Sequence, residues 1–220
     1  MAAIYADGIY VAAATLIRKD VVITAANLFE NAPQDTISVE AGDWDRLRTV
    51  EKKPHHSRSV SDILIHEQLA LIFLDAPFFG THISPICLPL QESVFIEDFC
   101  RTIGWGQPAP SSFSANQSDS QSDILWFRNY AVMTPEDCRA ALPPESHSDT
   151  NVLCGADVSN EFSPHNLGGG LFCYVGRSVL VGVALSDKDW QPDTRPAIFV
   201  NISPYVPWIQ NEFALRNFTL

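Results

Sequence analysis

The sequence lacks an uninterrupted apolar run of about 18 residues, so we expect no membrane-spanning helix. Basic residues are also scarce, because 14 Lys and Arg stand against 26 Asp and Glu and give a formal net charge of −12. An acidic chain repels phosphate backbones, so no nucleic-acid partner is expected. The residues after Met1 lack the basic stretch and cleavage pattern of a signal peptide. If the protein is secreted, we expect the chain to be a fragment or a mature segment.

Cysteine is sparse and odd in number, with five in 220 residues. An odd count leaves at least one cysteine without an internal partner, and the count alone leaves the pairing open. The length suffices for a large core without help from disulfides. No linker-like break divides the chain, so we expect one domain over residues 1–220.

Helical patterns are few, whereas short runs rich in Val, Ile and Thr recur between turn residues and favour an all-β barrel or sandwich. Thr134 before Pro135 predicts the start of a short helix, and Ser203–Pro204 predicts a second one. The predicted strands are Ile9–Ile17, Asp20–Ala26, Ser61–Ile65, Leu69–Leu74, Arg101–Trp105, Ile124–Val132, Arg177–Leu185 and Ala197–Ile202.

Six short motifs follow one another over nearly the whole chain: Thr15–Leu28, Leu69–Ile72 with Pro85–Pro89, Gly104–Gly106, Cys154–Gly155, Gly168–Cys173, and Pro196–Val200 before Tyr205 and Trp208–Ile209. In this order they resemble the trypsin-like serine proteases. The resemblance implies two six-stranded antiparallel β-barrels with a cleft between them, a short intermediate helix and a C-terminal helix. The segment Ala41–Asp45 and Cys87 further resemble the clip-domain branch of arthropod haemolymph.

The catalytic positions that the resemblance implies hold residues unable to perform acyl transfer. The histidine, aspartate and serine of the family correspond here to Asn27, Gln68 and Leu167. Asn27 accepts no proton near neutral pH, Gln68 carries no charge to stabilise an imidazolium, and Leu167 has no nucleophilic atom. Loss of one such residue slows catalysis by about 10⁴–10⁶. We therefore expect a protein that is not an enzyme.

The surrounding positions also depart from the family pattern. Asn166 stands where the family has the aspartate that pairs with a newly cut N-terminus, and His165 stands at the oxyanion-hole glycine. The specificity-pocket base would fall at Glu161. The run that pairs with substrate corresponds to Leu185, Ser186 and Asp187. Because the residues of the substrate-binding groove also differ from the family pattern, a protein that merely binds substrate without cleaving it is not favoured.

The same resemblance implies a pairing of the cysteines. It pairs Cys100 with Cys173 and Cys138 with Cys154. It leaves Cys87 for a bridge to an upstream light chain or clip segment.

Several polar clusters are predicted to be structural. We expect His55–His56 to lie in a solvated loop, His66 to be a structural histidine, and Asp43 and Asp45 to be solvated acids without calcium. We expect no metal site and no cofactor. Five basic residues gather in this part of the chain and indicate an exposed loop or a docking patch: Arg46, Arg48, Lys52, Lys53 and Arg58.

Three Asn-x-Ser/Thr sequons are compatible with the secretory route. Asn116 lies in the Ser-rich segment Pro108–Asp123, which is predicted to be an exposed loop. Asn217 and Asn201 are the other candidates for glycosylation.

The resemblance implies a secreted, non-catalytic cofactor in an extracellular immune cascade of haemolymph, such as melanisation or complement-like opsonisation. Its implied partners are cascade serine proteases, a prophenoloxidase or a thioester-containing protein. One alternative is a non-enzymatic recogniser of microbial or matrix surfaces, although the charge of −12 argues against polyanion binding. Another is a hydrolase with relocated catalytic residues such as His66 or Ser163.

Overall fold

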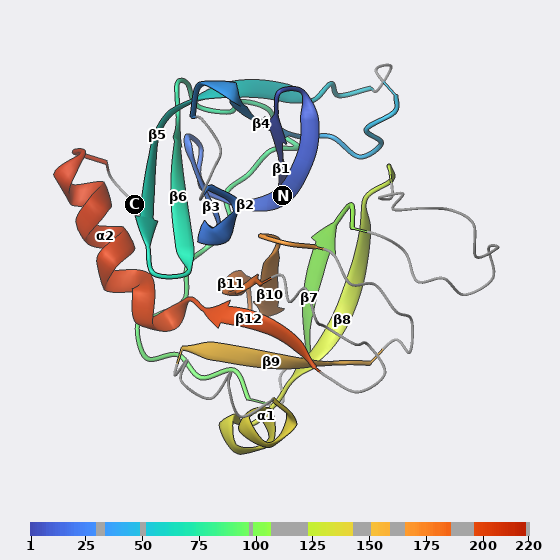
Figure 1. Cartoon of the computed structure of the whole chain (residues 1–220), viewed down its shortest axis with the longest axis vertical. Helices are drawn as coiled ribbons and strands as arrows, with labels where there is room; N and C mark the ends of the chain where they lie inside the picture. Colours follow the sequence, from blue (N-terminus) through green and yellow to red (C-terminus); the bar gives the residue numbers. More distant parts are fainter. Residues whose placement is uncertain are drawn as a thin grey trace.

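The computed structural model describes residues 1–29, 34–48, 52–96, 99–106, 123–142, 151–158, 166–185 and 196–218. The first half forms a barrel of β1 (Ala2–Ala6), β2 (Ile9–Arg18), β3 (Val21–Ala25), β4 (Ile37–Ala41), β5 (His56–His66) and β6 (Leu69–Leu74). The second half forms a barrel of β7 (Phe99–Gly104), β8 (Trp126–Val132), β9 (Val152–Asp157), β10 (Gly170–Tyr174), β11 (Ser178–Ala184) and β12 (Ala197–Asn201) (Figure 1).

Both barrels are closed and antiparallel. The strand order is β1-β2-β3-β6-β5-β4 in the first and β10-β11-β12-β9-β8-β7 in the second. The prediction of two six-stranded antiparallel barrels is therefore confirmed. The β1–β2 hairpin turns at Asp7 and Gly8, which both have positive φ, and an Asp-Gly pair adopts this conformation at low cost.

The β3–β6 pair holds the two barrels together. All residues of both strands are buried, which a strand facing solvent on one side would not show. Val22 and its cross-strand partner Ile72 fill the first barrel. Ile23 and its partner Leu71 point the other way, into a core cluster that includes Leu180 of the second barrel. Alternation along one pair of strands thus builds the core of a barrel and the junction between barrels.

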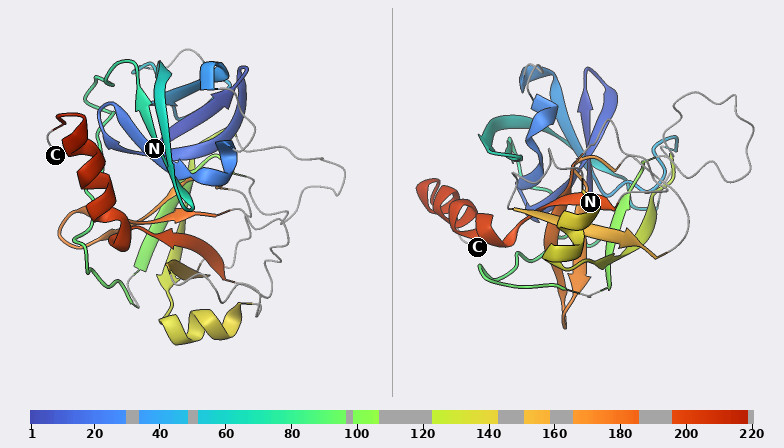
Figure 2. Two further views of the ribbon diagram at one scale, coloured as in Figure 1. Left: turned by 60° about the vertical axis from the view of Figure 1, so that its left-hand side comes forward. Right: turned by 60° about the horizontal axis from the view of Figure 1, so that its bottom comes forward.

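Two helices complete the fold. Helix α1 (Pro135–Ala141) begins as predicted at Thr134, whose hydroxyl accepts the N–H of Asp137 at 3.1 Å. A 3-10 turn, Ser203–Tyr205, leads into α2 (Val206–Leu215). Helix α2 lies beside β5 in Figure 1 and in the left view of Figure 2, and it buries Ile209 and Phe213 in the junction core. Within the described residues, no helix is long and apolar enough to span a membrane.

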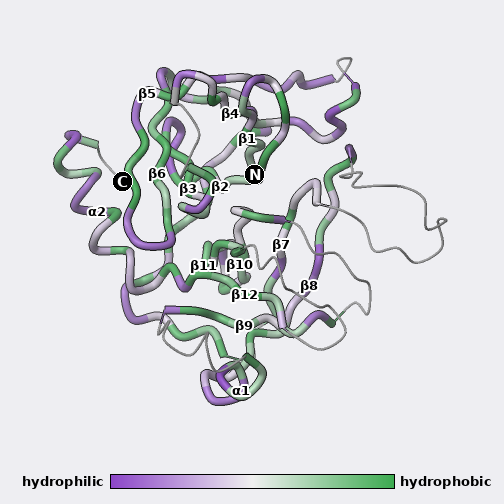
Figure 3. The backbone as a smooth tube through the Cα atoms, in the orientation of Figure 1, coloured by the Kyte–Doolittle hydropathy of each residue, from purple (hydrophilic) through white to green (hydrophobic). Residues whose placement is uncertain are grey.

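The sequence patterns missed four strands, β1, β4, β9 and β10, and placed one boundary wrongly. His55–His56 was expected in a loop, but His56 is the first residue of β5, an eleven-residue strand. Its exposed and half-buried residues alternate, so its first half lacks the apolar run that marks a strand in sequence. In Figure 3 the hydrophilic turn that joins β5 to β6 stands out from the more hydrophobic strands on either side of it.

Candidate functional site

Asn27 and Gln68 lie on adjacent segments of the first barrel. Asn27 belongs to the 3-10 helix Ala26–Phe29 that follows β3, and its side chain is exposed. Gln68 lies in the turn between β5 and β6. Because β3 and β6 are paired up to this end, the N–H of Ala26 donates to the carbonyl of Gln68 at 2.9 Å. The structure therefore brings these two positions together.

The segment carrying Leu167 docks on the first barrel near the end of β3. The carbonyl of Leu167 accepts the N–H of Ala13 at 3.0 Å. Gly168 follows with φ +76°, and a Cβ there would lie 2.0 Å from Oγ1 of Thr24, so only glycine fits. The N–H of Gly168 donates to the carbonyl of Ala184 in the second barrel at 2.9 Å. Leu167 thus lies where the two barrels meet.

The chemistry of these three side chains is limited. Leu167 is half-buried and packs against the core cluster shared by both barrels, where it contributes apolar contact. Asn27 and Gln68 supply amides, which form hydrogen bonds but transfer no proton near neutral pH. Together the three residues supply neither a general base nor a nucleophile.

Asn166 ties the Leu167 segment to the second barrel. Its Nδ2 donates to the carbonyl of Ile103 on β7 at 2.8 Å. The amide covers Gly104 so closely that a Cβ there would lie 1.7 Å from Oδ1 of Asn166. A carboxylate at this position has no donor for the Ile103 carbonyl. The neutral amide therefore suits this contact, and an aspartate would not.

The remaining predicted groove positions are only partly described. Leu185 is half-buried, packs against the junction core, and donates its N–H to the carbonyl of Ile198 at 3.1 Å. Four other predicted positions lie outside the described residues: Glu161, His165, Ser186 and Asp187.

Comparison with known proteins decides the family. The model of the trypsin family, described as "Trypsin", matches residues 1–209. The chain belongs to the trypsin family. It is 27% identical over 219 residues to "Inactive CLIP domain-containing serine protease A8" of Anopheles gambiae, covering 91% of this chain and 58% of that protein.

Further relatives come from other insects. The chain is 27% identical over 229 residues to "Inactive CLIP domain-containing serine protease A3" of Aedes aegypti, covering 94% of this chain and 47% of that protein. It is 25% identical over 229 residues to "Phenoloxidase-activating factor 2" of Galleria mellonella, covering 94% of this chain and 73% of that protein. The chain thus spans about half the length of the two inactive relatives, at 58% and 47%.

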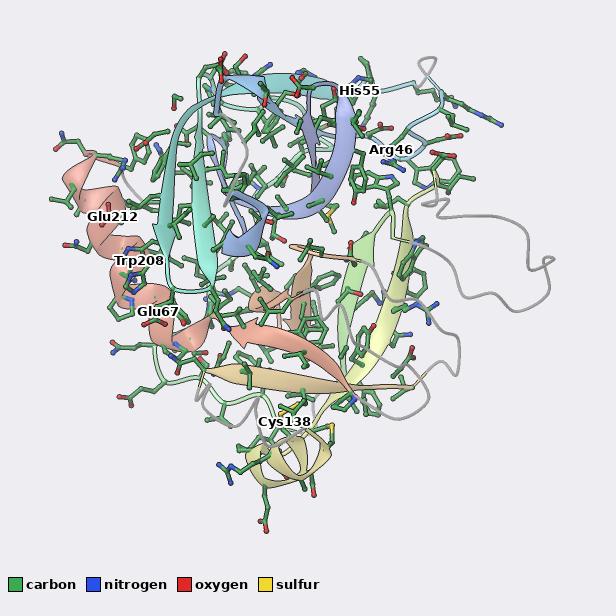
Figure 4. All side chains as sticks on the ribbon, viewed as in Figure 1. Arg46, His55, Glu67, Cys138, Trp208 and Glu212 are labelled. Carbon is green, nitrogen blue, oxygen red and sulfur yellow. A yellow bond between two sulfur atoms is a disulfide. The ribbon has the colours of Figure 1, made fainter. Side chains whose placement is uncertain are left out.

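His66 of this trypsin-family chain lies in an aromatic cluster. Its ring stacks on Trp208 of α2 with centroids 4.7 Å apart and meets Tyr205 edge to face at 5.9 Å. The hydroxyl of Tyr205 donates to Oε2 of Glu67, and Figure 4 shows the labelled Trp208 and Glu67 together at the contact between α2 and the β5–β6 turn. These contacts fit the expected structural histidine. Ser163, the other relocated candidate, lies outside the described residues.

The trypsin-family barrels hold two disulfides. Cys100 and Cys173 are directly opposite on β7 and β10 and are bonded, and Cys138 of α1 is bonded to Cys154 of β9. Cys87 is free and exposed. Its backbone is nevertheless fixed, because its carbonyl accepts the N–H of Leu180 at 2.9 Å.

A cavity of about 490 Å³ opens beside Cys87. Its lining comes from both barrels and from the first residue of the chain. The apolar members of this lining include Met1, Leu16, Ile86, Ile103 and Phe172. The free thiol therefore adjoins a mainly apolar hollow at the junction of the barrels.

Two acids expected to be solvated are buried. Asp43 is 8% exposed and Asp45 is 5% exposed, which contradicts the prediction from sequence. Oδ1 of Asp43 accepts the N–H of Asp45 at 3.1 Å, and Oδ1 of Asp45 accepts the N–H of Leu47 at 3.2 Å. Arg48 pairs with Asp45 at 3.0 Å. These turn contacts compensate the burial of the carboxylates, and sequence alone shows no sign of them.

No group of three or more potential metal ligands is found in the described part of the chain.

The predicted sequons differ in surroundings. Asn201 is half-buried, and its Oδ1 accepts the N–H of Ser203, whose side chain is buried and donates to the carbonyl of Ser93. Asn217 is exposed beyond α2, with φ +55°. Asn116 lies outside the described residues.

Proposed function

We propose that this chain is a non-catalytic serine protease homologue that acts as a binding cofactor in an extracellular immune cascade. The observation that carries the proposal is the junction of the barrels, where the family match leads us to assign Asn27, Gln68 and Leu167 to the triad positions. None of these side chains can serve as base or nucleophile. Any acceleration of hydrolysis above the uncatalysed rate in water would then come only from binding the substrate.

Similarity to named relatives supports the same proposal. Two insect relatives are called inactive and a third is called a phenoloxidase-activating factor. We infer from these names a secreted haemolymph protein that acts on a protease cascade leading to melanisation. The proposed partners are cascade serine proteases, a prophenoloxidase or a thioester-containing protein.

The free cysteine suggests how the chain is held in a larger protein. The Cys87 thiol is exposed beside the junction cavity. We propose that it forms a disulfide with an upstream light chain or clip segment, whose apolar residues occupy that cavity. Non-reducing peptide mapping of the full-length protein should recover Cys87 joined to an upstream peptide. Recovery of Cys87 as a free thiol would contradict this linkage.

The absence of catalysis is tested with a fluorophosphonate probe, which bonds covalently to activated serine nucleophiles. The purified chain should remain unlabelled under conditions in which an active trypsin is labelled.

A further inference from the structure

Two segments of the first barrel form a surface without acidic residues. Residues 52–58 and 76–82 contain no Asp or Glu, although the chain carries a net charge of −12. Side-chain contacts join the two segments. Nζ of Lys53 donates to Oγ1 of Thr81 at 3.0 Å, and Nε2 of His82 lies 3.3 Å from the carbonyl oxygen of Pro54. The rings of His56 and His82 are 6.2 Å apart.

The positive charges of this surface have neutral partners. The guanidinium of Arg58 donates to the carbonyl of Pro77 at 3.0 and 3.2 Å and to that of Ser57 at 2.7 Å. Within the described residues, no carboxylate forms an ion pair with Arg58, Lys52 or Lys53. Five other arginines do form such pairs: Arg18, Arg46, Arg48, Arg128 and Arg216. The positive potential here is therefore left for solvent or for a partner.

An exposed aromatic ring adjoins these charges. Phe79 is 58% exposed and lies in the same loop as Thr81 and His82. Nζ of Lys19 lies 5.9 Å from the centroid of the Phe79 ring. The N–H of Phe78 donates to the carbonyl of Lys19 at 2.7 Å, which fixes the loop on the β2–β3 turn. The basic–aromatic surface is thus defined by Lys19, Lys52, Lys53, His55, His56, Arg58, Phe79 and His82.

Figure 4 shows the labelled His55 at the outer end of the first barrel, far from the labelled Trp208. Three described acids border this surface: the exposed Asp75 precedes residues 76–82, Glu40 is the cross-strand partner of Ser57, and Asp20 follows Lys19. Asp20 is engaged by Arg18 at 2.9 Å. The surface is therefore a local basic area within an acidic molecule.

We propose that the basic–aromatic surface docks a short acidic peptide segment of a partner protein, in which carboxylates alternate with an aromatic side chain. Lys52, Lys53 and Arg58 match the carboxylates, and Phe79 matches the ring. A long sulfated polysaccharide fits less well, because its charge extends beyond the surface and meets the repulsion of a chain at −12. The proposal deepens the proposed cofactor role by naming the chemistry of a partner.

The test measures peptide binding by fluorescence anisotropy. The probe is a labelled octapeptide of Asp, Glu and Phe, and its matched control replaces the acids by Asn and Gln. We expect the acidic peptide to bind saturably and the control peptide not to bind. The affinity for the acidic peptide should fall as the salt concentration rises. The double variant Lys52→Glu with Lys53→Glu should bind about tenfold more weakly. Phe79→Ser should weaken binding about threefold without changing its salt dependence.

The matched control variant is Arg139→Glu with Arg177→Glu, which changes the net charge equally at an exposed position of α1 and at an exposed position of the turn between β10 and β11. It should bind the acidic peptide within about twofold of the unaltered chain, because neither arginine belongs to the basic–aromatic surface. Thermal unfolding midpoints verify that both double variants are folded.

Equal weakening by both double variants, or no binding of the acidic peptide, would overturn the proposal. Binding of a heparin octasaccharide that depends on Lys52 and Lys53, without binding of the peptide, would also overturn it in favour of a polysaccharide. Peptide binding and fluorophosphonate labelling are separate readouts, so the failure of one proposal is distinguishable from the failure of the other.

Discussion

At the scale of single residues, the half-buried Tyr5 and the buried Tyr130 have raised pKa values. Burial, followed by the charge of Glu40, raises the pKa of Tyr5 from 10.0 to about 12. Burial, followed by the charge of Asp157, raises the pKa of Tyr130 to about 12 as well. A phenol whose pKa is higher in the folded state holds its proton more tightly there, so ionisation favours the unfolded chain.

We therefore predict that both tyrosines contribute to alkaline unfolding. Their contribution is fully present below about pH 10, the pKa of an unfolded tyrosine, and is lost as the pH rises toward about 12. Urea unfolding midpoints measured from pH 8 to 12 should fall across that interval. Tyr5→Phe should flatten the decline, whereas Tyr174→Phe, at a position 75% exposed, should leave it unchanged. A midpoint that stays constant up to pH 12 would contradict this explanation.

At the scale of elements, the Gly168 turn decides how the Leu167 segment joins the barrels. A Cβ at Gly168 would lie 2.0 Å from Oγ1 of Thr24 and 2.4 Å from the carbonyl of Ala13. Gly8 has the same φ of +76° in the β1–β2 hairpin, but nothing lies within 4 Å of its Cβ position. The two glycines therefore separate backbone strain from steric overlap.

We predict that Gly8→Ala costs about 1–2 kcal/mol, the penalty for a left-handed alanine. Gly168→Ala should cost at least about 2 kcal/mol more, because β2 and β3 must move to admit the methyl group. Chemical denaturation of both variants measures the difference. Equal losses of stability would show that the Leu167 segment is not packed tightly on the first barrel.

The elements also show where sequence patterns succeed. Strands β3 and β6 were predicted within one residue, because their fully buried runs are apolar except for Thr24. The starting residue of α1 was predicted from its capping threonine and following proline. Strand β10 was missed because its first residue, Gly170, ends a run of three glycines, and glycines in sequence indicate a turn. The backbone of Gly170 lies so close to the side chains of Thr15 and Leu180 that a Cβ would not fit there. This contact arises only in the folded structure and leaves no pattern in the sequence.

For the candidate site too, sequence predicts the chemistry of the side chains but not their arrangement in space. The chemical character of Asn27, Gln68 and Leu167 is readable from sequence, since it depends on side-chain type alone. The adjacency of the Asn27 and Gln68 segments depends on the pairing of β3 with β6, and the position of Leu167 at the junction depends on the docking of Gly168. The family resemblance implied this arrangement, and residue patterns did not. The burial of Asp43 and Asp45 was predicted wrongly, because turn hydrogen bonds that satisfy a carboxylate leave no composition signal.

At the scale of the whole molecule, two barrels share one core cluster and present different surfaces. The junction carries Leu167, which we propose stands at a former catalytic position, and the Cys87 cavity opens at the same junction. The basic–aromatic surface lies on the first barrel. This arrangement retains the trypsin-family scaffold while the proposed activity moves from the cleft to surfaces. Under the proposed function the chain acts by binding, so its effect on a cascade should not require its own hydrolysis of any substrate.

The most direct test of that account is covalent labelling of the purified chain by a fluorophosphonate probe, followed by mass spectrometry of the intact protein. Active trypsin, added at known amounts to the same sample, shows that the probe and buffer support labelling. The account predicts that the trypsin gains the probe mass while this chain keeps its unmodified mass. A stoichiometric adduct on a serine of this chain, lost when the protein is first unfolded by heat, would contradict it.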